Sequence, residues 1–136
     1  MPDLKDSMNI SAAGMKVQGV RVRVISENLA NADSTATVPG GDPYRRKTIT
    51  FQNALNRELG MKTVQVKSIG ADKGDFNLRF DPTHPAANAD GYVKTSNVSS
   101  LVEMTDMREA QRSYEANLSA ITISRSMLQR TVDLLR

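Results

Sequence analysis

Few residues in this chain have side chains suited to binding or catalysis, and those few lie in its middle. Arg45, Arg46 and Lys47 form a basic run that could contact phosphate, although such a short run more commonly forms a solvated face or an ion pair between subunits. His84 is the only histidine, and the sequence provides no partners with which it could bind a metal. Cysteine is absent, so disulfides and thiolate zinc sites are excluded.

Three aspartates in the same region could hold a hard cation. They are Asp72, Asp75 and Asp81, but the acidic pattern of a calcium-binding loop is missing, and turn formation explains the first two more simply. No glycine-rich phosphate loop or serine nucleophile motif is present. We therefore predict no catalytic residue, no metal ligand and no cofactor.

The elements on either side of this region carry a helical pattern. Alternating steps of four and three residues select an apolar stripe near the N-terminus, in a helix that we expect to start near Asp3 or Asp6 and to fade at residues 31–33. The same stepping selects a second stripe from Met107 to Leu135. A repeat of 3.5 residues is typical of a helix that lies along another helix, so both ends are predicted interaction surfaces.

The middle of the chain reads as loops and short strands. Residues 33–43 contain prolines and glycines and predict a loop, and a strand is predicted over 44–51. Alternating apolar residues predict a hairpin between 63–69 and 76–80, with the Gly- and Asp-containing segment between them as its turn. We expect an irregular stretch from there to Asn97.

The second helix is expected to begin beside Ser100 and Glu103, which have the spacing of a capping box. The predicted fold is therefore mainly α with a small β insert, in which the long terminal helices pair as an antiparallel coiled coil and the middle segment contains a β-hairpin. The predicted division is 1–32, 33–98 and 99–136. Two helices alone leave most of their surface facing water, so we expect neighbouring subunits to order them.

Composition agrees with an assembly role. The 136 residues contain 4% aromatics and seven methionines, which supply adaptable packing surface. A net charge of +3 is too small to favour nucleic acid as a partner. No stretch reaches the apolar length of a membrane span, and the first 30 residues lack the apolar core of a secretory signal, so we expect no membrane insertion and no cleaved signal peptide.

Motifs at both ends resemble those of the bacterial flagellar axial proteins, the rod and hook family. Near the N-terminus, Ser26-Glu-Asn-Leu-Ala-Asn-Ala-Asp-Ser-Thr35 is similar to the family's (S/A)-E-N-(I/L)-A-N-A segment. Val102-Glu-Met-Thr-Asp-Met-Arg-Glu-Ala-Gln-Arg-Ser-Tyr-Glu-Ala-Asn117 resembles the V-E-M-x-x-M-x-x-(A/T)-x-R-x-Y-x-x-N signature. Ala87-Asn-Ala-Asp-Gly-Tyr-Val93 is similar to A-N-P-x-G-Y-V, with Ala89 in place of the family's proline.

The resemblance implies a structural subunit of the flagellar basal-body rod, which crosses the periplasm and transmits torque from motor to hook. It also implies export through the flagellar type III apparatus, and as partners other rod proteins, copies of the chain itself, and MS-ring and export-gate components. The alternative from another class is a soluble coiled-coil adaptor that presents the basic β insert to an acidic partner or nucleic acid. An enzyme ranks last.

Subunit assembly is assigned to the two stripes together with asparagines and a methionine of the motifs. For the asparagines, hydrogen bonding between packed helices is favoured over an ordinary exposed or capping amide, and Tyr114 suits an interface or a plain core. The predicted assembly residues are Met8, Met15, Val22, Ile25, Asn28, Leu29, Asn31, Met104, Met107, Tyr114, Asn117, Leu118, Ile121, Leu128, Val132 and Leu135.

Overall fold

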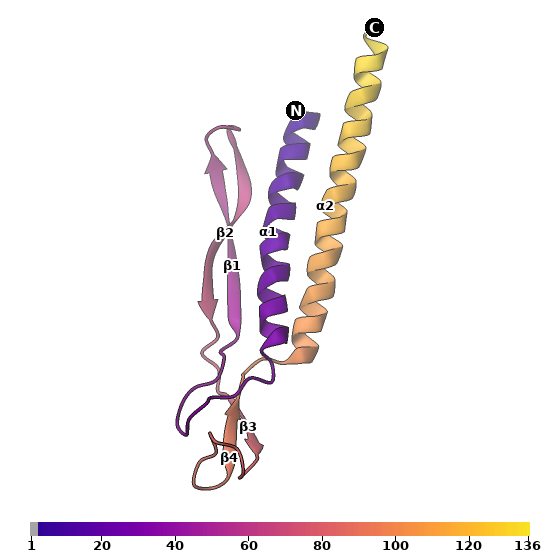
Figure 1. Ribbon diagram of the computed structural model, residues 1–136. Helices are drawn as coiled ribbons and strands as arrows, with labels where there is room; N and C mark the ends of the chain where they lie inside the picture. Colours follow the sequence, from indigo (N-terminus) through magenta and orange to yellow (C-terminus); the bar gives the residue numbers. More distant parts are fainter. Residues whose placement is uncertain (1–2) are drawn as a thin grey trace. The chain divides into compact units, whose positions relative to one another are not determined.

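The computed structural model describes residues 3–136 and contains two long helices separated by four strands (Figure 1). Residues 1 and 2 of the predicted N-terminal segment lie outside this range. The elements are α1 (Leu4–Ala30), β1 (Lys47–Asn56), β2 (Met61–Ala71), β3 (Asn77–Phe80), β4 (Tyr92–Thr95) and α2 (Ser100–Leu134). The prediction of a mainly α fold with a small β insert is confirmed.

Both helices begin and end close to the predicted residues. The backbone oxygen of Asp3 accepts the Ser7 N–H at 3.0 Å, and Asp6 places a carboxylate in the first turn of α1, where the helix dipole is positive. After Ala30, the Asn31 N–H bonds to carbonyls of the preceding turn as the helix tightens and ends. The 35 residues of α2 include no glycine or proline, so nothing interrupts the helix.

The predicted hairpin between 63–69 and 76–80 is wrong, because β2 pairs with β1 and not with β3. The reversal lies between Asn56 and Gly60, where the Asn56 side chain accepts the backbone N–H groups of the next turn residues and Gly60 takes a φ of +66°. This turn lacks an Asn-Gly or Asp-Gly pair, so its residue types do not indicate a hairpin. Strand β1 consequently begins later and runs longer than the predicted strand.

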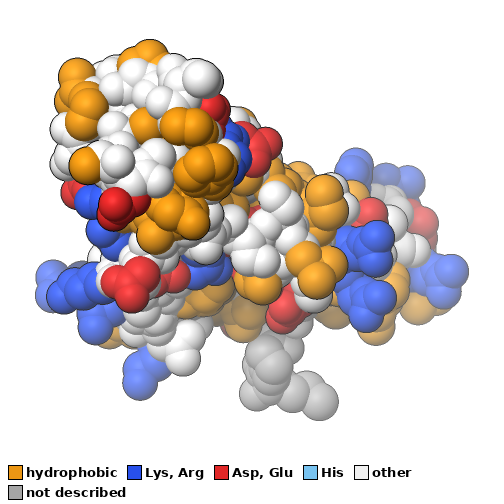
Figure 2. Space-filling model, turned by 90° about the horizontal axis from the view of Figure 1, so that it is seen from below, with side chains coloured by type: hydrophobic (Ala, Val, Ile, Leu, Met, Phe, Trp, Pro, Cys, Tyr) orange, Lys and Arg blue, Asp and Glu red, His pale blue; other side chains and the backbone are white. Residues whose placement is uncertain are grey.

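The second sheet joins β3 to β4, a segment that the sequence predicts as irregular. The strands are antiparallel, with Phe80 opposite Tyr92 and Arg79 opposite Val93. Val93 is buried together with Ala36 and Ala86, whereas the other face exposes Leu78, Phe80 and Tyr92. Figure 2, seen from the side on which Figure 1 draws β3 and β4, shows hydrophobic side chains grouped on the nearest surface. The short β4 was missed because its four residues lie close to turn residues on both sides.

The chain forms two compact units, each of which contains part of both helices. The first comprises residues 3–22, 50–68 and 108–136, and in it α1 lies between the hairpin tip and α2 (Figure 1). The second comprises residues 23–49 and 69–107.

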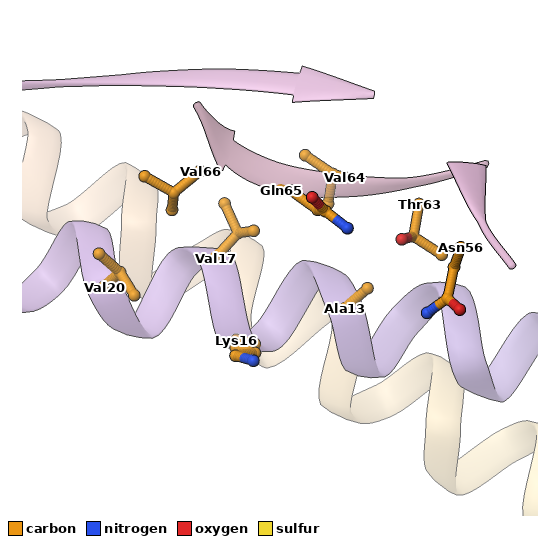
Figure 3. A pocket seen from close by; sticks show the side chains of 9 residues that line it. All are labelled: Ala13, Lys16, Val17, Val20, Asn56, Thr63, Val64, Gln65 and Val66. Atoms are coloured by element: carbon orange, nitrogen blue, oxygen red, sulfur yellow. The ribbon is translucent and has the colours of Figure 1, made fainter. Parts of the chain in front are cut away.

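Small apolar side chains form the core of each unit. In the first, Val17 and Val20 of α1 face Val64 and Val66 of β2 across a hollow (Figure 3). In the second, Val93 packs with alanines beneath the β3–β4 sheet.

Gly91 tests the packing of the second sheet. Its φ of +85° disfavours any side chain, and a Cβ there would lie 2.9 Å from the Phe80 ring. We expect Gly91→Ala to destabilise the second unit by about 1–3 kcal/mol, measured by denaturant unfolding followed by circular dichroism.

The matched control is Gly40→Ala, because Gly40 has a φ of +79° but open space around it. It should carry the backbone strain without the clash and so cost less. Equal losses for the two variants would contradict the role given to the Phe80 contact.

Candidate functional site

The most constrained polar group in α1 is the amide of Asn28, which is 1% exposed. Its oxygen accepts the Tyr44 hydroxyl at 2.7 Å and the Lys47 N–H at 2.9 Å, and its nitrogen donates to the Lys47 carbonyl at 2.9 Å. The side chain thus bonds both backbone groups of Lys47, as a neighbouring strand would. Asn28 fixes the C-terminal part of α1 to the start of β1.

Glu103 of α2 completes this buried junction. It is 1% exposed and accepts from the Asn28 amide at 3.3 Å and from Nε of Arg46. Arg46 also reaches Asp72 at 3.3 Å and Asp106 at 3.7 Å. The hydrogen bond to Glu103 is the main cause of the raised pKa of Arg46. A buried carboxylate is tolerated because it is both paired and hydrogen-bonded.

This arrangement corrects the interpretation of Glu103. The capping-box spacing with Ser100 predicts that its carboxylate turns back to the helix start, but the carboxylate instead contacts Asn28 and Arg46. The residue therefore ties α2 to α1 and β1. Sequence spacing could not show this, because the two partners lie 57 and 75 residues away.

The basic run is occupied by contacts within the chain. Arg45 lies over the Phe76 ring at 4.2 Å and donates to the carbonyls of Asp72 and Gly74 at 2.9 Å each. Lys47 pairs with Glu27 at 2.8 Å.

The Lys47–Glu27 hydrogen bond is the main cause of two pKa shifts, lowering that of Glu27 and raising that of Lys47. This ion pair and those of Arg46 neutralise positive charge within the chain. In the adaptor alternative, the same charge would bind an external acidic partner or nucleic acid.

His84 and the aspartates hold loops in place. Nδ1 of His84 accepts the Ala86 N–H at 3.0 Å, so Nε2 carries the proton and donates to Oγ1 of Thr35 at 3.1 Å. Asp72 accepts the Gly74 N–H at 2.8 Å, the first cause of its lowered pKa, and Asp81 accepts the Thr83 hydroxyl at 2.9 Å. Within residues 3–136, no three potential ligands lie close enough together to hold a metal.

The predicted assembly residues divide by exposure. Ile25 and Asn28 are buried within the chain, where Asn28 donates to Glu103 of α2, and a role of Asn28 in subunit assembly stays a prediction. Asn31 and Asn117 instead bond carbonyls of their own helix or its end. Met8, Met15, Val22, Leu29, Asn31, Met107, Asn117 and Ile121 are half-buried. Met104, Tyr114, Leu118, Leu128, Val132 and Leu135 are exposed.

The face of α2 nearest α1 is one that the apolar pattern does not include. Its most buried positions are Glu103, Ala110 and Ser124, and the half-buried Asn117 continues the same spacing of seven. Asn117 lies so close to Gly14 of α1 that a Cβ on the glycine would be 2.8 Å from its amide nitrogen. These residues are small or polar, so a search for apolar stripes passed over them. Their regular spacing was the signal available in the sequence.

A groove lies beside this face in the first unit. It measures about 370 Å³ and is lined by Gly19 and Val22 of α1 and by Gln111, Tyr114 and Glu115 of α2. The groove therefore brings together Val22 and Tyr114, two predicted assembly residues from opposite ends of the chain.

Two long helices, joined through a hydrogen-bonded junction and with an exposed apolar stripe on α2, are typical of a structural protein. Over residues 3–136, no helix combines the length and apolar character needed to cross a membrane. The family model described as "Flagellar basal body rod FlgEFG protein C-terminal" matches residues 89–134, which span β4 and all of α2.

Relatives match along the whole chain. A flagellar basal-body rod protein FlgC from Agrobacterium fabrum is 49% identical, covering 100% of this chain and 98% of the relative. FlgC proteins from Bacillus subtilis (41% identical, covering 94% and 95%) and Salmonella typhimurium (37%, covering 96% and 97%) are also similar. The chain belongs to the FlgC family of flagellar basal-body rod proteins. It is a structural subunit of that rod and not an enzyme.

The buried amide of Asn28 gives a stability prediction. Asn28→Ala should lower the free energy of unfolding by about 2–4 kcal/mol, because it leaves the Tyr44 hydroxyl and both backbone groups of Lys47 without their partner. Urea unfolding followed by circular dichroism measures this loss. Asn31→Ala is the control and should cost about 0.5 kcal/mol, since Asn31 makes only local bonds. Similar losses for both variants would refute a special role of Asn28.

The lowered pKa values of Glu27 and Asp72 give a pH prediction. Both carboxyls take up protons more readily in the unfolded chain, near pH 4, so their contribution is present above about that pH and is lost as pH falls through the folded values. Urea midpoints measured from about pH 6 to pH 3 should therefore decline at the acid end, and only modestly, because both carboxyls are well exposed. Glu27→Gln should flatten the decline, and an unchanged slope would remove the Lys47 pair as its cause.

Proposed function

We propose that the chain polymerises through its two terminal helices, paired as an antiparallel coiled coil, with other rod proteins and with copies of itself. The order of the contacts supports this pairing. Moving forward along α1, Gly14 meets Asn117 and Arg21 meets Glu109 at 3.4 Å, so the partner residues on α2 run backward. Heptad-spaced small residues on α2 allow the close approach that such a pairing needs.

The observation that carries the proposal is the exposed apolar surface of α2. Tyr114, Leu118, Leu128 and Val132 remain between 39% and 46% exposed, and all four belong to one predicted stripe. Arg125 interrupts this stripe between Leu118 and Leu128, but a row of exposed apolar side chains still favours an interaction site. Copies and relatives in a rod would cover it, giving a shaft that crosses the periplasm and transmits motor torque to the hook.

The proposed division of labour follows the predicted segments. Residues 1–32 and 99–136 serve as the helical core of the axis, and residues 33–98 form the insert, whose Lys47 and Arg46 bond to Asn28 and Glu103 of the helices. We assign export to the flagellar type III apparatus without a cleaved signal peptide, and contact with MS-ring and export-gate components. Membership of the rod protein family supports these assignments.

The same proposal includes no nucleic-acid partner and no membrane insertion. Arg46 and Lys47 are paired with carboxylates, and Arg45 is occupied by Phe76 and two carbonyls. A ligand that depends on free cations in this run would have to break these contacts first.

Leu118 tests the assembly stripe. Leu118→Asp should block incorporation into the rod and abolish swimming while the chain is still expressed, because assembly would bury an unpaired charge. Swimming in soft agar and immunoblots of purified basal bodies provide the readouts. Ser119→Asp adds the same charge at the next, exposed position outside the stripe and should be tolerated. Normal swimming with Leu118→Asp would contradict the assignment.

A further inference from the structure

The C-terminal turns of α2 extend beyond the start of α1 in the first unit (Figure 1). Gly14 lies against Asn117, and Leu4 precedes Gly14 by ten residues. With a rise of about 1.5 Å per residue in both helices, Leu4 is level with about residue 127 of α2. Within the described residues, α1 therefore has no turn to cover α2 from Leu128 onward.

These uncovered turns are apolar on one side. Leu128 and Val132 lie on one face of α2, and Leu135 follows in the closing turn, where its N–H bonds to the Val132 carbonyl at 3.2 Å; the three are 39%, 44% and 83% exposed. We refer to these three residues as the overhang stripe. Such a stripe requires an apolar partner surface for burial.

The groove of the same unit offers a surface of that kind. Val22 and the ring of Tyr114 contribute its apolar lining, and Gln111 and Glu115 its polar part. A volume of about 370 Å³ and an open shape suit a few side chains from a docked helix.

Gly19 gives a separate reason to expect a close partner in this groove. Glycine inside a helix costs about 1 kcal/mol relative to alanine. Gly14 has an explanation within the chain, because Asn117 fills the space of a Cβ, but no atom lies within 4 Å of a Cβ built on Gly19. The described residues therefore give no reason for glycine at position 19, and a close approach from outside the chain would supply one.

We propose that the overhang stripe of one subunit packs into the groove of a second copy. The charges are complementary, because residues 125–136 carry three arginines and one aspartate, and Glu115 is the charged residue among those lining the groove. Stripe and groove are different surfaces, so each copy can donate one and accept the other, which gives an open, repeating contact. The inference rests on the proposed rod assembly and specifies one contact within it.

Disulfide trapping tests this contact directly, since the chain has no cysteine of its own. Cells co-express one copy with Gln111→Cys and another with Leu135→Cys, and purified basal bodies are oxidised. The expected result is a covalent dimer containing one copy of each variant. Ile123→Cys in place of Leu135→Cys is the control and should give no dimer, because Ile123 is exposed on another face of α2.

Gly19→Ala provides a second readout with opposite effects on folding and assembly. The alanine should stabilise the helix of the isolated chain, whereas its methyl group should lower incorporation into basal bodies about tenfold by crowding the docked helix.

Unimpaired incorporation, no trapped dimer, or trapping only to a different rod protein would overturn the inference while leaving the proposed function intact. Absence of the parent chain from purified basal bodies would instead defeat the proposed function itself.

Discussion

The burial of one carboxylate constrains the whole second unit. Glu103 is almost fully withdrawn from water, and an ionised group in that position is tolerable only if its partners are fixed around it. Arg46 and the Asn28 amide are those partners, and they come from the start of the insert and from the other helix. Removing either partner would leave a buried charge or amide without a hydrogen bond. The network therefore fixes α1, the start of the insert and α2 to one another at this point. The two helices are thus joined at that point through a polar network.

Side-chain size decides which face of α2 approaches α1 and which face stays exposed. Ala110 and Asn117 allow α2 to approach α1 closely, and the bulkier Tyr114 and Leu118 on the adjacent face stay exposed. One helix therefore carries two faces with different heptad registers, a small one that is satisfied by α1 and a large apolar one that is not. Because the two faces do not coincide, pairing within the chain does not consume the surface available to neighbours.

Much of this architecture could be read from the sequence, and the failures have physical causes. Helix boundaries follow from dipole-compatible aspartates at the start of α1 and from the lack of glycine and proline in α2, which are local signals. Strand pairing is not local, and the segment 70–75 looks like a better turn than 57–60 although the latter makes the hairpin. The role of Glu103 was equally hidden, because its spacing fits a cap and its actual partners are distant in sequence. Apolar periodicity identified the large stripe and missed the small one.

The contact between the helices has a mechanical consequence. Gly14 and Asn117 bury little hydrocarbon where they meet, so separating the helices at that point exposes little new apolar surface to water. A contact of this kind therefore opposes separation of the two helices only weakly at that point.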